Sequence, residues 1–422
     1  MRKTKRVKTK RVKTKRVKTK RVKKKGVNKE KLLTQKKMRS VNNLVNRLTK
    51  SIKQKLVTVG ILTAPFISHA DSYITSYMGS SYVKWIESAG ALVVPLEYNL
   101  PKPILLGFLK QLNGIVLIGG SIENKKTHTN KQFLMYEETI QYILNYTKYQ
   151  NKIGNYYPVW CTCMTFELTA AFAMEKDILK KQKDIYKYLI KEGFDGGNTL
   201  HWTKEPSKLK KLFTQEELNK MSKEECVFYT HSLSLKYDSN HIKKFSKYAN
   251  IVATGLTKEN KIKYIAIYEL KNMPLYGVQF HPEKIQFEYY NNGYRVPKTD
   301  IAIKFSTKLA NFFISECRKN SNIWIGGKKF YDFTINDYNI FNKPISARLR
   351  HLHKENITDS IGPWGPGVYF FGPTVVPTGK NIIPNPWQLS IGVNNDDNDD
   401  NDDNNDDNDD DEYDEYDELE LS

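Results

Sequence analysis

Short apolar runs alternate with longer amphipathic segments between residues 56 and 174. A continuous apolar run is typical of a strand buried on both faces, whereas apolar residues recurring every three or four positions are typical of a helix. The expected strands are residues 56–62, 91–96, 114–118 and 157–161, and the expected helices are 80–89, 104–112, 131–149 and 164–174. This strict alternation predicts an α/β fold with a mostly parallel central sheet and helices on both faces.

The pattern changes in the second half of the chain. Residues 176–222 are Lys-rich and polar, which favours helices and loops over one edge of the sheet. Apolar runs then follow one another more closely and predict a mixed extension of the same sheet, with strands at 226–229, 251–254, 262–270 and 275–280. An amphipathic segment at 299–319 is expected to close the domain as a helix.

The two ends of the chain differ from everything between them. Residues 1–25 hold 16 basic residues and no acidic one, in a repeated Lys-Thr-Lys-Arg-Val pattern, and residues 396–422 hold 17 acidic residues and no basic one. Blocks of like charge repel and bury too little apolar surface to fold, so both ends are predicted to be disordered. Four regions follow: a basic tail and lead-in (1–54), a folded domain (55–320), a Gly-, Pro- and aromatic-rich appendage without an assigned role (321–395) and an acidic tail (396–422).

The strong positive charge indicates which kinds of partner the chain could bind. The whole chain carries a formal charge of +21, and residues 26–395 alone hold 51 basic and 29 acidic residues. The basic tail could bind nucleic acid or an anionic surface through counterion release. It could equally serve as a nuclear-import signal or contact the acidic tail of its own or another chain. The sequence leaves these alternatives open.

Other patterns bear on the cellular compartment. No stretch approaches the ~18–20 apolar residues of a membrane-spanning helix, and the first thirty residues lack the apolar core of a secretory signal. Four cysteines in 422 residues argue against a disulfide framework. We therefore expect an intracellular protein, in the cytoplasm or nucleus or packaged in a particle.

Two segments that are distant in sequence carry candidate chemistry. Each reads as a buried strand that ends at a reactive side chain, Cys163 in one and His281 in the other, with Glu283 two residues further on. A thiol, an imidazole and a carboxylate are the parts of a cysteine hydrolase, in which nucleophile and base lie far apart in sequence and close in space. The helix expected after Cys163 and a nearby histidine would both lower the pKa of the thiol.

Backbone amides for an oxyanion are expected at two places. Gly119 and Gly120 follow the strand at 114–118, and Met164 begins the helix after Cys163. In an open parallel sheet these strand ends would meet at the carboxyl edge, where such folds bind ligands. The alternatives are a buried structural cysteine or a metal site. Cys161 and Cys163 lack a second pair at ligand spacing, so no metal is expected.

These segments resemble the gamma-glutamyl hydrolases, a branch of the class I glutamine amidotransferase-like superfamily. The resemblance covers roughly residues 56–319. It is carried by the segments 81–91 (Ser-Tyr-Val-Lys-Trp-Ile-Glu-Ser-Ala-Gly-Ala), 113–121 (Asn-Gly-Ile-Val-Leu-Ile-Gly-Gly-Ser), 158–167 (Pro-Val-Trp-Cys-Thr-Cys-Met-Thr-Phe-Glu) and 276–284 (Tyr-Gly-Val-Gln-Phe-His-Pro-Glu-Lys). The last segment, with its Tyr-Gly-Val-Gln prefix, is specific to the hydrolase branch.

The resemblance implies a flavodoxin-like three-layer sandwich and hydrolysis of gamma-glutamyl amide bonds, typically in folylpoly-gamma-glutamates, without metal or cofactor. It implies that Cys163 attacks the amide carbonyl to form a thioester, which water assisted by His281 releases. Glu167, one helical turn beyond Cys163, would help to recognise the glutamyl group. Glutamine hydrolysis that feeds ammonia to a synthase is a further alternative, but the chain contains no synthase domain.

The chain departs from the family pattern at two places. Cys161 and Thr165 occupy the glycine positions that flank the nucleophile, where side chains are expected to crowd a tight turn. Tyr229 stands where the family often has a histidine, and His231 follows on the same strand face, so both are expected at the substrate site. These departures support an alternative: a weakly active or inactive relative that serves in binding or structure through its charged tails.

Overall fold

The computed structural model describes residues 56–66, 75–120, 131–174, 185–257, 259–291, 294–325, 333–338, 340 and 367–371. The predictions for the basic tail and lead-in, for the acidic tail and for most of residues 321–395 lie outside the described residues.

The core is an eight-stranded sheet. Its strands run in the order β4 (Ala91–Leu96), β1 (Val57–Leu62), β5 (Gly114–Leu117), β6 (Val159–Thr162), β14 (Leu275–Val278), β13 (Lys263–Leu270), β12 (Ala249–Leu256) and β9 (His201–Trp202). The first five are parallel to one another, and the last three are added antiparallel. The parallel part has the 2-1-3-4-5 order of flavodoxin-like sheets. The predicted α/β class with a mostly parallel sheet is confirmed.

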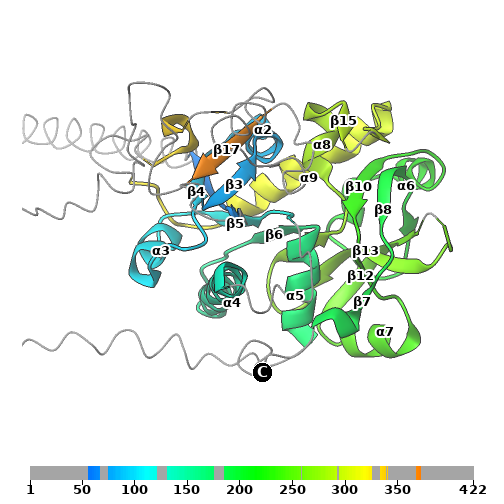
Figure 1. Ribbon diagram of the computed structural model, residues 1–422, viewed down its shortest axis with the longest axis horizontal. Helices are drawn as coiled ribbons and strands as arrows, with labels where there is room; N and C mark the ends of the chain where they lie inside the picture. The colour runs from blue at the N-terminus through cyan, green and yellow to red at the C-terminus, as the bar shows by residue number, and fades with distance from the viewer. Residues whose placement is uncertain are drawn as a thin grey trace, which may run out of the picture. The chain divides into compact units, whose positions relative to one another are not determined.

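Helices cover both faces of this sheet (Figure 1). One layer contains α2 (Ser80–Ser88), α8 (Pro282–Phe287) and α9 (Asp300–Cys317), and the other contains α3 (Lys102–Leu109), α4 (Lys131–Lys152), α5 (Met164–Met174) and α7 (Ser239–Phe245). Two separate hydrophobic clusters lie under the two layers. The described part of the chain is therefore a three-layer sandwich.

Strand β4 illustrates why these apolar runs form buried strands. All six of its residues are buried. Val93 belongs to the cluster under α2 and α9, whereas its neighbours Leu92 and Val94 belong to the opposite cluster. Successive side chains of a strand point to opposite faces, so a sheet covered on both sides requires apolar residues at every position.

The prediction for residues 176–222 was only partly right. This region contains α6 (Gln215–Met221) and the short 3₁₀ turns Ile185–Tyr188 and Lys210–Leu212, but also β7 (Leu189–Ile190), β8 (Phe194–Asn198) and β9. The run at 226–229 is a strand, β10 (Val227–His231), yet it pairs with β8 in a separate two-stranded sheet. Its assignment to the central sheet was wrong, because an apolar run identifies a strand without identifying its partner.

Smaller sheets lie around the core. β11 (Ser234–Leu235) pairs with β7, and β15 (Tyr290–Asn291) pairs with β16 (Tyr294–Arg295). β2 (Ala64–Pro65), β3 (Ser76–Gly79) and β17 (Val368–Phe371) form a three-stranded sheet, in which the Thr75 N–H also donates to the Phe371 carbonyl oxygen (2.8 Å). A 3₁₀ turn at Ile335–Asp337 precedes β17. Residues 368–371 of the appendage therefore pair directly with a strand that leads into α2.

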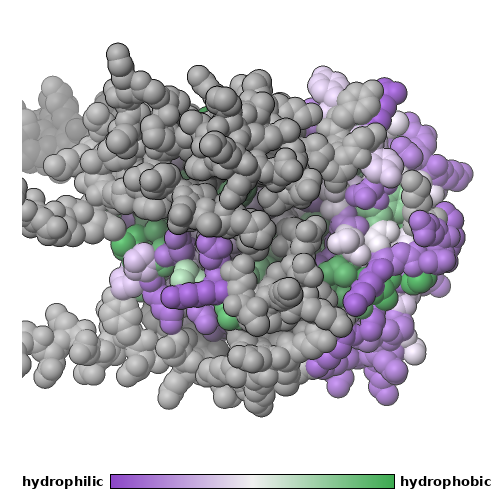
Figure 2. All heavy atoms as spheres, viewed as in Figure 1, coloured by the Kyte–Doolittle hydropathy of each residue, from purple (hydrophilic) through white to green (hydrophobic). Residues whose placement is uncertain are grey.

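The described surface is largely polar. Figure 2 shows mainly hydrophilic side chains over α6 and α7, with only small hydrophobic areas between them. Among the described helices, none is both long enough and apolar enough to span a bilayer.

Candidate active site

Cys163 lies at the sharp turn between β6 and α5. Its φ is +55°, a left-handed conformation that costs a residue with a side chain about 1–3 kcal/mol. Its N–H donates to the Val278 carbonyl oxygen of β14 (2.9 Å), and its carbonyl oxygen accepts the Glu167 N–H (3.1 Å). The side chain is 4% exposed, and its sulfur lies 3.8 Å from the Thr230 carbonyl oxygen of β10. This strand–turn–helix geometry is that of a nucleophile elbow.

His281 follows the neighbouring parallel strand, β14, and precedes α8. Its N–H donates to the Phe228 carbonyl oxygen of β10 (2.8 Å). Its Nδ1 lies 2.7 Å from Glu283 Oε1 in a pair that is almost completely buried. Its Nε2 is buried and has no hydrogen-bond partner in the described part of the chain. With the proton held at Nδ1 by the carboxylate, Nε2 is left as the basic nitrogen.

Gly119 lies between the cysteine and the histidine. A Cβ at this position would stand 3.0 Å from Cys163 Cβ and 2.9 Å from His281 Cε1, so the two predicted residues flank one point. Any side chain here would displace one of them. The end of β5 thus needs glycine because both functional groups approach its backbone. The structure brings Cys163, His281, Glu283 and Gly119 together as expected at the carboxyl edge.

The Gly119 N–H is engaged by a residue that the sequence analysis did not select. It donates to Tyr82 Oη (2.9 Å), and the same oxygen lies 3.3 Å from His281 Nδ1. Tyr82 is 5% exposed on α2. Its spacing within an amphipathic helix made it look like an ordinary core residue, and nothing in the local pattern signals a hydroxyl aimed at the site.

The other two expected oxyanion residues are Met164, which begins α5 directly after Cys163, and Gly120, which follows β5. The Met164 backbone N–H lowers the pKa of the Cys163 thiol and so favours its thiolate form. A Cβ on Gly120 would meet Met164 Cε (2.8 Å) and lie 3.4 Å from Tyr77 Oη. Gly120 therefore lies against the Met164 side chain.

The expected lowering of the pKa of the Cys163 thiol was wrong. Burial raises this pKa well above its ordinary value, and the nearby Glu167 and Glu283 carboxyls raise it further. The Met164 N–H and Lys284 act in the predicted direction but do not compensate. Loss of hydration raises the pKa of the buried thiol more than the positive end of one helix lowers it. A sequence does not reveal which of these two effects is larger.

This pKa has a direct consequence for alkylation. Because the thiolate is the reactive form, the rate at which iodoacetamide modifies Cys163 in the free protein should still rise as the pH passes 9. Mass spectrometry of the peptide that contains Cys163 measures this rate. Cys161, whose thiol has a pKa of about 12, serves as the internal control for general cysteine alkylation. A rate that is already constant at neutral pH would contradict the raised pKa.

Glu167 is buried behind the cysteine. It accepts a hydrogen bond from Gln279 Nε2 (2.8 Å) and is 3% exposed. Burial raises its pKa to about 8, and the Gln279 hydrogen bond only partly opposes this shift. Its carboxyl is therefore mainly protonated at neutral pH, which limits its unfavourable effect on a Cys163 thiolate.

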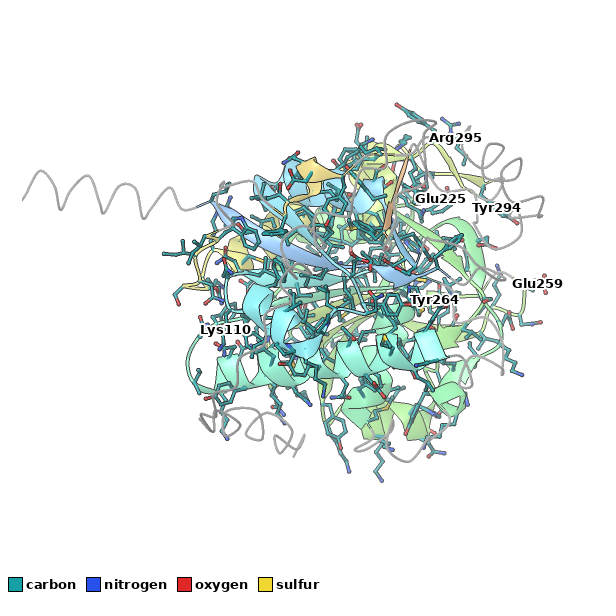
Figure 3. All side chains as sticks on the ribbon, turned by 60° about the vertical axis from the view of Figure 1, so that its left-hand side comes forward. Lys110, Glu225, Glu259, Tyr264, Tyr294 and Arg295 are labelled. Atoms are coloured by element: carbon teal, nitrogen blue, oxygen red, sulfur yellow. The ribbon has the colours of Figure 1, made fainter. Side chains whose placement is uncertain are left out.

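Tyr229 and His231 lie on one face of β10 and pack against Tyr264, with ring centroids 5.2–5.7 Å apart. Figure 3 shows Tyr264 inside the body of the fold, whereas Glu259 lies at its periphery. His231 Nδ1 donates to the Leu233 carbonyl oxygen (2.7 Å), and its Nε2 is a buried acceptor. Burial lowers the pKa of His231 to about 3, and the neighbouring His281 lowers it further. His231 is therefore a neutral imidazole close to His281.

The two residues at the family's glycine positions fit into the turn. Cys161 is fully buried in β6 opposite Gly277 of β14. Thr165 is also fully buried, and its hydroxyl bonds to the backbone of Thr162 in β6 and of Leu117 in the neighbouring strand β5. Among the described residues with side chains, positive φ occurs at Cys163 but at neither Cys161 nor Thr165. The elbow thus forms without glycine at these positions. Within the same described ranges, no group of three or more His, Cys, Asp or Glu side chains could hold a metal ion.

Comparison with known proteins identifies the family of this chain. A model of the peptidase C26 family matches residues 59–283, more than half of the chain. Gamma-glutamyl hydrolase B of Dictyostelium discoideum is 28% identical over 67% of this chain and 78% of its own length. Gamma-glutamyl hydrolase of Homo sapiens is 32% identical over 60% and 74%, and probable gamma-glutamyl hydrolase 3 of Arabidopsis thaliana is 29% identical over 63% and 74%. The chain is a hydrolase of the peptidase C26 family.

Proposed function

We propose that this protein hydrolyses gamma-glutamyl amide bonds, in folylpoly-gamma-glutamates or similar peptides, through a thioester on Cys163. The observation that carries the proposal is the arrangement of Cys163, on a nucleophile elbow, and His281, whose Nδ1 is held by Glu283 and whose Nε2 has no hydrogen-bond partner among the described residues. The relatives named gamma-glutamyl hydrolase supply the bond type.

The proton path follows from the raised thiol pKa. In the free enzyme the Cys163 thiol keeps its proton, and His281 Nε2, which has no hydrogen-bond partner among the described residues, takes this proton as the sulfur attacks the gamma-carbonyl carbon. The same proton then passes to the leaving amine as the carbon–nitrogen bond breaks. Water, losing a proton to His281, attacks the thioester, and Cys163 leaves and recovers that proton. Glu283 holds the imidazole in one orientation throughout.

Backbone donors stabilise the oxyanion in this proposal. The Met164 N–H lowers the pKa of the Cys163 thiol, and Gly120 lies against the Met164 side chain. We assign these two amides to the oxyanion. Gly119, whose N–H bonds to Tyr82, contributes by leaving space for the cysteine and the histidine.

Glu167, His231 and Tyr229 are assigned to the substrate. The neutral His231 offers Nε2 as an acceptor, which suits an N–H group of the glutamyl substrate. Glu167 and its partner Gln279, which has a buried carbonyl oxygen without a hydrogen-bond partner in the described part of the chain, supply both donors and acceptors close to the elbow. Tyr229 packs against the His231 ring and holds it in place.

The test is hydrolysis of a linkage-matched substrate pair. Purified protein is expected to release glutamate from a gamma-linked diglutamyl folate and to leave the alpha-linked isomer intact, as measured by chromatography of the products. The two isomers have the same charge and composition, so the difference reports on the gamma-amide alone. Equal cleavage of both, or of neither, would contradict the proposal.

A further inference from the structure

The side chain of Thr165 connects two strand ends that carry the site. Its Oγ1 accepts a hydrogen bond from the Thr162 N–H (3.1 Å) and donates to the Leu117 carbonyl oxygen (2.7 Å), with the Thr162 carbonyl oxygen as a second acceptor at 3.0 Å. Thr162 is the last residue of β6, and Leu117 is the last residue of β5. One hydroxyl therefore joins the end of the cysteine strand to the end of the glycine strand.

This link lies where the sheet itself no longer connects the two strands. The β5–β6 ladder ends at the pair Leu117–Cys161, so Cys163 and Gly119 lie beyond the last paired residues. Their backbones must nevertheless approach closely, because a Cβ on Gly119 would come within 3.0 Å of Cys163 Cβ. The Thr165 hydroxyl continues the connection between β5 and β6 past the end of the ladder.

Thr165 is itself firmly held. It is fully buried, and its carbonyl oxygen accepts a hydrogen bond from Thr169 Oγ1 (2.7 Å), which lies 2.5 Å from Tyr268 Oη on β13. A buried hydroxyl group can fix the position of the groups bonded to it to a fraction of an ångström. This requires that all its hydrogen bonds are formed and that the backbone of its residue is held in place. The glycine of the family pattern has no group that could do this.

We infer that Thr165 is a positioning residue for Cys163: its hydroxyl fixes the nucleophile turn relative to Gly119 and Gly120. The kinetic consequence rests on the proposed function, whereas the effect on the reactivity of Cys163 does not. A displaced sulfur would lose alignment with the oxyanion donors and the substrate carbonyl, and such misplacement slows the chemical step more than it weakens substrate binding.

The experiment compares three variants. Thr165→Val keeps the shape of the side chain and removes the hydroxyl, and Thr165→Ser keeps the hydroxyl and removes the methyl group. Thr147→Val is the matched control, since it removes a buried hydroxyl from α4 whose hydrogen bond goes to the Leu144 carbonyl oxygen (3.0 Å) of the same helix. Thr165→Val should lower kcat about 10-fold with little change in KM, the loss expected from one positioned hydrogen bond. Thr165→Ser and Thr147→Val should keep a kcat close to that of the wild type.

Two results would overturn the inference: a Thr165→Val kcat equal to that of Thr147→Val, or a Thr165→Ser kcat as low as that of Thr165→Val. Should Thr165→Val fail to fold, Thr165→Gly removes the hydroxyl without steric conflict and takes its place. Iodoacetamide alkylation of Cys163 gives a readout without substrate, and its rate should change in Thr165→Val and not in Thr147→Val. A wild type without gamma-glutamyl hydrolysis would refute the proposed function, while the alkylation rates would still decide the role of Thr165.

Discussion

Replacing Cys163 with alanine is expected to lower kcat/KM for a gamma-glutamyl substrate by on the order of 10⁴-fold or more. Alanine removes the sulfur that forms the thioester, and no other described side chain in the site can replace it as a nucleophile. His281 and Glu283 form a buried pair of their own, so they should stay in place. The loss should therefore appear as a loss of chemistry, with folding intact by circular dichroism and thermal unfolding.

Cys161→Ala provides the matched control. Cys161 lies two residues earlier on the same strand, is fully buried, and has a thiol whose pKa burial raises to about 12. Cys161 belongs to the hydrophobic cluster that also contains residues of α4 and α5. Cys161→Ala should keep its activity. Should Cys163→Ala hydrolyse the substrate as fast as Cys161→Ala, the thioester mechanism would be untenable.

Replacing His281 with glutamine is expected to lower kcat by about 10²–10⁴-fold with a smaller change in KM. In the free enzyme the pKa of the Cys163 thiol is raised by burial, so the sulfur depends on a base to become a nucleophile. Glutamine can still approach Glu283 but cannot accept the thiol proton. Activity should then recover partly at high pH, where the thiolate forms without a base, and a pH profile of kcat measures this recovery.

His241→Gln is the control for this substitution. His241 Nδ1 pairs with Asp238 Oδ2 at 2.7 Å, the same separation as in the His281–Glu283 pair, but at the start of α7 and partly exposed. Its replacement should leave kcat unchanged at every pH. A His281→Gln protein with the pH profile and rate of His241→Gln would show that His281 is not the base.

Most of the fold could be predicted because its elements are local. Strands such as Ala91–Leu96 are continuous apolar runs, and α9 has apolar residues on one side and Thr299 as its N-cap. The position of β10 could not be predicted, since its pairing with β8 depends on a strand of five residues with two adjacent glycines. Such a strand has little apolar character, and the sequence pattern does not distinguish it from a loop.

The site also combines features that the sequence predicts with features that it does not. Cys163, His281 and the glycines at the end of β5 follow buried strands, so the carboxyl edge of a parallel sheet was the expected meeting place. Tyr82 could not be found in this way, because its hydroxyl reaches Gly119 and His281 from a helix over the sheet. Thr165 was expected to crowd the turn, and the structure shows its hydroxyl bonded to both adjoining strand ends.

The sequence by itself determined the class of fold, and it pointed to a candidate nucleophile, base and carboxylate at the ends of parallel strands. These depend on residue type and spacing along the chain, which a sequence displays directly. Only the tertiary structure decided the pKa of Cys163 and the contacts of Tyr82 and Thr165. Desolvation, and hydrogen bonds between distant segments, arise from the packing of many residues around one atom, and no local pattern encodes that packing.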